Sequence, residues 1–126
     1  MNWEERHVLV TGGASFISSH LVDKLVEFGA KVTVVDNLSN GKKENLSKSW
    51  DSIKFIQQNL EYISKKEIEN IFQDNEIVFH FAAVHGGRGY IDTHPADVCS
   101  NFAIDHHVFE ACNNTGVEKV IFSSSA

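Results

Sequence analysis

Short apolar runs along the chain alternate with longer segments that carry apolar residues at helical spacing. The runs are too short for helices and read as buried strands, at residues 7–11, 31–36, 53–57, 77–81 and 117–122. The longer segments predict helices over residues 16–28, from Ser64 onward and over 96–113. This order predicts an α/β fold, a doubly wound parallel sheet of about five strands in the order 3-2-1-4-5 with helices on both faces.

Turn and cap residues mark the ends of these elements. Gly29 and Gly116 follow the first and the last helix as stop signals, and Ser64 with Glu67 makes a capping-box pattern. Residues 37–41 are a polar turn after the second strand. Because ligands of such sheets bind where the strand order reverses, we expect a site at the carboxyl ends of strands 1 and 4.

Composition narrows the class of protein. The chain has 126 residues, 42% of them hydrophobic, and reads as one domain over residues 1–126. Its formal net charge of −6 argues against a nucleic-acid or anionic-membrane partner. The acidic N-terminus is no secretory signal, and no run approaches the ~20 apolar residues of a spanning helix. Cys99 and Cys112 lie about 20 Å apart in one predicted helix, which is too far for a disulfide between them. Because unpaired cysteines are typical of the reducing cytosol, we expect a cytoplasmic protein.

The histidines carry no metal-site pattern. No Cys/His spacing of a zinc site is present, so no metal is expected. We expect His20 and His80 to pack inside with one ring nitrogen hydrogen-bonded.

The first strand runs into a glycine turn that opens a helix, which is the layout of a dinucleotide-binding unit. Gly12 stands where the first glycine of that motif makes the tight turn. Ser15 and Ser18 stand where the second lets the backbone reach the pyrophosphate and the third lets the helix pack on the strand. We expect the Ser18 side chain to crowd the helix against the strand, with a penalty of typically ~1–3 kcal/mol.

Asp36 ends the second strand, where an acid can accept hydrogen bonds from both hydroxyls of an adenosine ribose. A carboxylate there would repel a 2′-phosphate, so NAD is favoured over NADP. In the alternative interpretation Asp36 only caps the loop that follows.

Several motifs in order make the chain similar to a known family. These are Thr11-Gly12-Gly13-Ala14-Ser15-Phe16-Ile17-Ser18-Ser19-His20, Asp36-Asn37-Leu38-Ser39-Asn40-Gly41, His80-Phe81-Ala82-Ala83 and Phe122-Ser123-Ser124-Ser125-Ala126. They resemble the extended short-chain dehydrogenases/reductases, and within these the NAD-dependent nucleotide-sugar epimerases and dehydratases of the UDP-glucose 4-epimerase-like kind. The resemblance implies a Rossmann domain that binds NAD and covers the N-terminal portion of the family's length.

The resemblance also implies roles for individual residues. The expected cofactor-binding residues are Gly12, Ser15, Phe16 and Ile17 near the pyrophosphate, Asp36 and Asn37 at the ribose, Asn59 and Leu60 at the adenine, and Phe81, Ala82, Ala83 and Asn101 toward the nicotinamide. Ser125 matches the catalytic serine that hydrogen-bonds the substrate hydroxyl. Residues 84–94 are expected to form a glycine-rich loop, and its part at 84–90 is expected to border the sugar of a nucleotide-sugar substrate. The 96–113 helix is expected to form half of a homodimer interface.

The family reaction is a transient hydride transfer to NAD, for which a tyrosine with a lowered pKa removes the hydroxyl proton. The Tyr-x-x-x-Lys pair that supplies this base is expected beyond the fifth strand, so the chain alone is not expected to be catalytic. Tyr62 and Lys66 have the same spacing but lie before the fourth strand, and read as a solvated helix start.

Three hypotheses therefore stand. The chain is the NAD-binding portion of a nucleotide-sugar epimerase or dehydratase, or a degenerate homologue that acts as a non-catalytic nucleotide-binding or interaction module. The third hypothesis, an unrelated Rossmann protein such as a methyltransferase, is disfavoured by the segments at 80–83 and 123–125.

Overall fold

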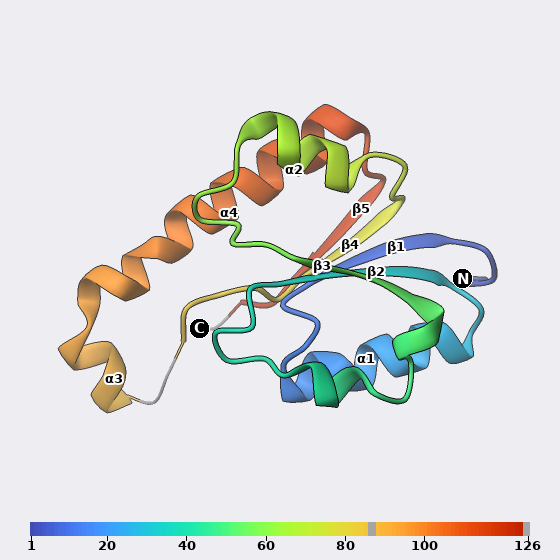
Figure 1. Cartoon of the computed structure of the whole chain (residues 1–126). Helices are drawn as coiled ribbons and strands as arrows, with labels where there is room; N and C mark the ends of the chain where they lie inside the picture. The colour runs from blue at the N-terminus through green and yellow to red at the C-terminus, as the bar shows by residue number, and fades with distance from the viewer. Residues whose placement is uncertain (86–87, 125–126) are drawn as a thin grey trace.

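The computed structural model describes residues 1–85 and 88–124, and its strands form one parallel sheet (Figure 1). The strands are β1 (His7–Thr11), β2 (Lys31–Asp36), β3 (Ile53–Gln57), β4 (Ile77–His80) and β5 (Lys119–Phe122). They lie in the order β3-β2-β1-β4-β5, with every neighbouring pair parallel. The predicted fold class and strand order are confirmed.

Helices cover both faces of this sheet (Figure 1). One face carries α1 (Phe16–Glu27) with the short 3-10 helix η1 (Lys43–Leu46), and η2 (Trp50–Ser52) follows before β3. The other face carries α2 (Lys65–Phe72) and α4 (Pro95–Thr115), which pack on each other. The short helix α3 (Arg88–Thr93) and the start of α4 project away from the sheet.

Two hydrophobic clusters separate the layers, because successive strand residues point to opposite faces. Val8 and Val10 of β1 join the cluster under α1, whereas Leu9 joins the cluster under α2 and α4. Phe72 and Val108 are completely buried in the second cluster. The capping box at Ser64 is confirmed, with the Ser64 hydroxyl accepting from the Glu67 N–H at 3.2 Å.

The buried face of α1 differs from its apolar pattern. Ile17 and Phe28 are 81% and 57% exposed, and the helix buries Ser18, Ser19, Val22 and Leu25 instead. Ser18 and Ser19 are each 4% exposed, so the first turn of α1 buries small polar side chains. The prediction of a loop over 84–94 is wrong in part, since Arg88–Thr93 forms the helix α3.

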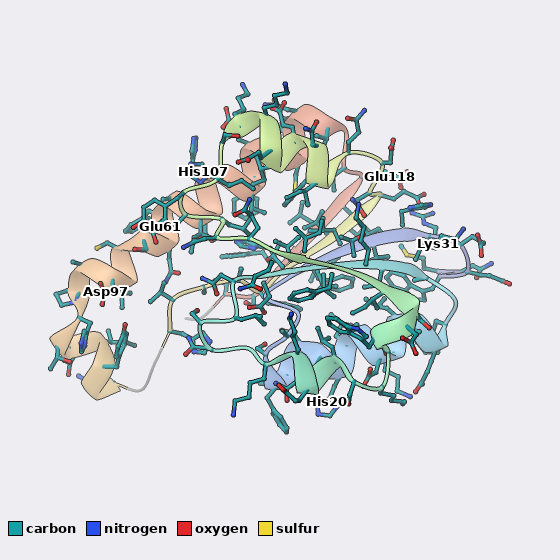
Figure 2. The ribbon with its side chains drawn as sticks, in the orientation of Figure 1. His20, Lys31, Glu61, Asp97, His107 and Glu118 are labelled. Atoms are coloured by element: carbon teal, nitrogen blue, oxygen red, sulfur yellow. The ribbon has the colours of Figure 1, made fainter. Side chains whose placement is uncertain are left out.

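The amino edge of the sheet is held by charge pairs. Arg6 contacts Glu76 at 3.3 Å and Glu118 at 3.1 Å, which ties the residues before β1, β4 and β5 together. Figure 2 shows Lys31 and Glu118 near this edge, on the opposite side of the molecule from Asp97. Cys99 and Cys112 are both free. None of the helices within the described ranges is long and apolar enough to cross a membrane.

Candidate functional site

A cleft opens at the carboxyl ends of β1, β2 and β4, where the strand order reverses. It is lined by nine of the predicted site residues, Gly12, Ser15, Asp36, Asn37, Asn59, Leu60, Phe81, Ala82 and Ala83, and by Val35, Ser39, Asn40, Gly41, Gln58, Val84, His85 and Ile104. These residues lie close together because parallel pairing brings the carboxyl ends of the strands to one edge of the sheet. Whether these residues bind a cofactor stays a prediction.

The Asp36 carboxylate joins the end of β2 to the glycine turn. Its Oδ2 accepts the Ala14 N–H at 2.9 Å and its Oδ1 accepts the Leu38 N–H at 2.8 Å. The side chain thus caps the following loop, as the alternative interpretation required. An ionised carboxylate has about four acceptor positions, so the bonds from Ala14 and Leu38 leave about two of them unused. Capping the loop therefore does not by itself exclude a further hydrogen bond to this carboxylate.

Gly12 is required at the tight turn after β1. Its φ is +69°, which favours glycine, and a Cβ built on it would lie 2.8 Å from the backbone nitrogen of Ala82. Its N–H donates to the carbonyl of Val35 at 2.7 Å. The turn therefore passes directly against the segment that leaves β4.

Ser15 and Ser18, which replace glycines of the motif, bond to each other. The Ser15 hydroxyl donates to the Ser18 hydroxyl at 3.0 Å, and Ser18 is 4% exposed. Ser15 is the N-cap of α1 but its side chain accepts no hydrogen bond from the first turn. The positive end of α1 at the cleft is therefore not neutralised by its cap.

Gly41, which ends the motif after the second strand, lines the cleft although it was not among the predicted cofactor-binding residues. A Cβ on it would lie 2.9 Å from both the Ala14 Cβ and the Asp36 Oδ2, so the 37–41 turn folds back over the glycine turn. The Lys42 N–H and the Asn45 side-chain amide both donate to the Ala14 carbonyl, at 3.0 and 2.9 Å. A glycine at the end of a polar turn after Asp36 was the available signal. No comparable signal in the sequence pointed to three other lining residues, Val35, Gln58 and Ile104.

Three predicted residues do not line this cleft. Phe16 and Ile17, in the first turn of α1, are 72% and 81% exposed. Asn101 lies in α4, and its amide accepts the Val84 N–H at 2.7 Å and donates to the Val84 carbonyl at 2.9 Å. It thereby holds the cleft wall, and it lines a neighbouring hollow together with Phe81, Ala82 and Ala83. Ser125 lies outside the described residues.

His80 is buried at the end of β4 with both ring nitrogens bonded, not one. Nδ1 lies 2.6 Å from the Thr11 hydroxyl and Nε2 lies 2.8 Å from the Asp105 carboxylate. Burial lowers the pKa of His80, while Asp105 acts in the opposite direction. The expectation for His20 is wrong, because this side chain is exposed and its ring contacts Phe16.

Tyr62 does not have the properties of a general base. It is 79% exposed, and the neighbouring Glu61 raises the pKa of its hydroxyl instead of lowering it. Figure 2 shows Glu61 and His107 together on the α4 side of the sheet, where His107 Nδ1 lies 2.7 Å from the Leu60 carbonyl.

Residues 1–85 and 88–124 contain no group of three or more His, Cys, Asp or Glu placed to hold a metal ion.

The fold and the cleft together define a Rossmann-type protein, with a glycine turn, a helix N-terminus and a strand-end acid at the switch point of the sheet. A family model described as the NAD dependent epimerase/dehydratase family matches residues 8–126. The chain belongs to this family. The NAD assignment is thereby confirmed at the level of the family.

Individual relatives agree with this assignment. A putative UDP-glucose 4-epimerase of Methanocaldococcus jannaschii is 34% identical over 119 residues, covering 94% of this chain and 37% of the relative. A solved UDP-N-acetylglucosamine 4-epimerase of Methanobrevibacter ruminantium is 38% identical with a TM-score of 0.85, covering 98% of this chain and 39% of that one. The UDP-glucose 4-epimerase of Brucella ovis, solved with NAD, is 30% identical with a TM-score of 0.83, covering 96% and 36%. The chain thus spans well under half the length of these relatives.

Proposed function

We propose that this chain is the NAD-binding portion of a nucleotide-sugar epimerase or dehydratase that acts by transient hydride transfer to NAD. The observation that carries the proposal is the placement of the Asp36 carboxylate, 2.9 Å from the Ala14 N–H of the glycine turn and in one cleft with Phe81–Ala83. Family membership supports the same conclusion.

The residues present fit an adenine dinucleotide. The start of α1 has an uncapped positive end for a pyrophosphate, and Asp36 keeps two acceptor positions for ribose hydroxyls. The buried apolar side chain of Leu60 gives the adenine a surface to pack on. NAD, when bound, supplies the hydride acceptor. The chain's residues bind and orient it and exclude NADP, whose 2′-phosphate Asp36 would repel.

Nucleotide-sugar turnover is proposed only for a protein that also carries the family's tyrosine base. Tyr62, with its raised pKa and exposed position, does not supply it. A second candidate function, a non-catalytic nucleotide-binding or interaction module, is favoured by the Ser15–Ser18 bond, which places two hydroxymethyl groups in the phosphate turn. Tight NAD binding is expected of the first candidate and excludes an interaction module that has lost the cofactor, whereas loss of NAD binding with retained folding supports such a module.

Titration calorimetry with NAD+ and NADP+ tests the proposal. We expect NAD+ to bind and NADP+ to bind more weakly. Asp36→Asn should reduce this preference, because it removes the charge that repels the 2′-phosphate. Asp74→Asn is the matched control, since Asp74 is exposed, lies outside the cleft and has a φ of +68°, which asparagine tolerates. Equal affinity for both nucleotides in the unaltered chain would contradict the assigned role of Asp36.

The partner and compartment follow as parts of the same proposal. We place the chain in the cytoplasm, which the two free cysteines support.

We also propose a homodimer through α4, which Phe102, 78% exposed on that helix, supports. Sedimentation velocity should show a dimer that Phe102→Ser converts to a monomer, and a monomeric unaltered chain would contradict the assignment.

A further inference from the structure

A row of hydrogen bonds runs from β1 through β4 to α4 behind the cleft. Parallel register sets Thr11 opposite His80, and the imidazole lies between the Thr11 hydroxyl and the Asp105 carboxylate. The row is enclosed, since Thr11 is completely buried and His80 is 1% exposed. Its outer end, Asp105, is partly exposed on α4.

The donors and acceptors in this row determine which nitrogen of His80 carries the proton. A threonine hydroxyl has one hydrogen and two acceptor lone pairs. Thr11 Oγ1 accepts the N–H groups of Phe81 and Ala82, each at 3.1 Å, which uses both lone pairs. Its hydrogen is therefore donated to His80 Nδ1 at 2.6 Å, so Nδ1 is unprotonated. The ring proton sits on Nε2 and is donated to Asp105 at 2.8 Å.

We propose that His80 is a positioning residue whose neutral, Nε2-protonated form holds the Phe81–Ala82 wall of the cleft, so that protonating the ring loosens the wall and weakens binding of the adenine dinucleotide. This inference rests on the proposed function, because the ligand it concerns is NAD.

Protonation disturbs the wall because Thr11 has no acceptor position left. A charged imidazole carries a hydrogen on both nitrogens, so Nδ1 would have to donate to Thr11 Oγ1. One of the two backbone N–H groups must then leave the hydroxyl oxygen, and the hydroxyl hydrogen loses its acceptor. The Phe81 N–H can fall back on the Thr11 carbonyl, which it already contacts at 3.1 Å, whereas Ala82 donates to the hydroxyl alone. The wall therefore loses a hydrogen bond in either case.

The affected segment is in direct contact with the glycine turn. A Cβ on Gly12 would lie 2.9 Å from the Ala82 Cα, so no space separates the turn from the wall. Gly12, Phe81 and Ala82 all line the cleft. A shift of Ala82 is therefore a change in the shape of the binding site.

The surroundings of the ring determine the pH at which this happens. From α4 it is faced by the Asp105 carboxylate and the edge of Phe109, from β5 by the stacked ring of Phe122, and from β1 by Thr11. Asp105 is thus the charged group among these neighbours. Burial lowers the pKa of His80 from its ordinary 6.5, and Asp105 offsets part of this shift. The neutral form therefore prevails above 6.5, and affinity for NAD+ should fall as the pH drops through the lowered pKa.

Two measurements on the intact chain test the inference. Long-range proton–nitrogen NMR spectra of the histidine rings report the tautomer without any ligand, and we expect His80 to carry its proton on Nε2. Calorimetry with NAD+ from about pH 8 downward, through the pH at which NMR shows His80 to titrate, should show a 2- to 10-fold weakening, roughly the net worth of one hydrogen bond, in step with that titration.

Variants separate this role from a merely structural one. His80→Asn keeps an acceptor for the Thr11 hydroxyl but cannot titrate, so NAD+ binding should persist with a flattened pH profile. Asp105→Asn keeps an acceptor for Nε2–H and removes the charge, so the transition should move to lower pH. His106→Asn, on the exposed side of α4, is the control and should change nothing.

The outcomes distinguish this inference from the proposed function. An Nδ1-protonated ring, or constant NAD+ affinity while His80 titrates, overturns the inference and leaves the proposed function standing. Absence of NAD+ binding at every pH overturns the proposed function, and with it the ligand-linked part of the inference.

Discussion

The Asp36 carboxylate accepts the backbone N–H of Ala14 at 2.9 Å, so the end of β2 is tied to the glycine turn that follows β1. A second bond, from the Leu38 N–H at 2.8 Å, fixes the loop that leaves β2, where Leu38 has a φ of +62°. One side chain thus shapes both sides of the cleft floor. Its structural role and its proposed ligand-binding role have to be separated by experiment.

Asp36→Ala should destabilise the chain, because Ala14 and Leu38 would keep N–H groups without acceptors. The expected loss in the free energy of unfolding is about 1–3 kcal/mol. Urea denaturation followed by circular dichroism measures it. Asp36→Asn retains one acceptor oxygen, so its free energy of unfolding should lie between those of the unaltered chain and of Asp36→Ala. A stability unchanged in Asp36→Ala would show that water satisfies both N–H groups.

Gly12→Ala and Gly116→Ala separate backbone strain from steric overlap. Both glycines have a positive φ, +69° and +73°, but a Cβ meets Ala82 at 2.8 Å only at Gly12 and meets nothing within 4 Å at Gly116. Gly116→Ala should therefore lose roughly 1 kcal/mol of unfolding free energy from the left-handed conformation. Gly12→Ala should lose a further ~1–3 kcal/mol from overpacking, by the same denaturation assay. Equal losses would mean that the two turn segments move apart freely.

Replacing both serines of the phosphate turn by glycine should tighten NAD+ binding. The Ser15→Gly, Ser18→Gly double variant removes the side chains that bond each other at 3.0 Å beside the start of α1. If the overpacking penalty of ~1–3 kcal/mol falls on the bound state, affinity rises roughly 5- to 150-fold. Titration calorimetry measures the change, and Ser18→Ala alone, which keeps the Cβ, is the control. No gain in the double variant would remove the idea that the serines hinder binding.

The two cysteines should differ sharply in thiol reactivity. Cys99 is exposed, whereas Cys112 is buried and desolvation raises its pKa to about 11. Because the thiolate is the reactive form, a disulfide reagent at mildly alkaline pH should modify one thiol per native chain and two after unfolding. Mass spectrometry should place the native modification on Cys99. Rapid reaction of Cys112 in the native chain would show that α4 leaves the sheet readily.

Local patterns were sufficient for most elements. The apolar runs predicted all five strand positions, and Ser64 with Glu67 predicted the capping box that the structure contains. Helix α3 was missed, because a short, exposed helix carries no apolar periodicity. The burial of Ser18 was expected from its position in the glycine motif, where the helix packs on the first strand, whereas hydropathy gave no sign that Ile17 is exposed.

The chemistry of individual residue types identified only part of the candidate site, and the family resemblance supplied other lining residues such as Leu60 and Phe81. Gly12 and Asp36 were identifiable because a tight turn and a strand-end carboxylate require those residue types. Gln58 and Ile104 line the same cleft with side chains that signal nothing in the sequence. Asn101 lines a neighbouring hollow together with Phe81, Ala82 and Ala83, as the family resemblance led us to expect, but nothing in the sequence showed that its amide also bonds the Val84 backbone.

The amino-acid sequence by itself determined the order of strands and helices, the glycine turn and the acid that follows the second strand, because each depends on residues close together in the chain. Only the tertiary structure decided which polar groups meet. The bond between Asp36 and Ala14 and the row from Thr11 through His80 to Asp105 join residues from different elements. Their contacts depend on the register of parallel strands and on the seating of α4, which long-range packing sets.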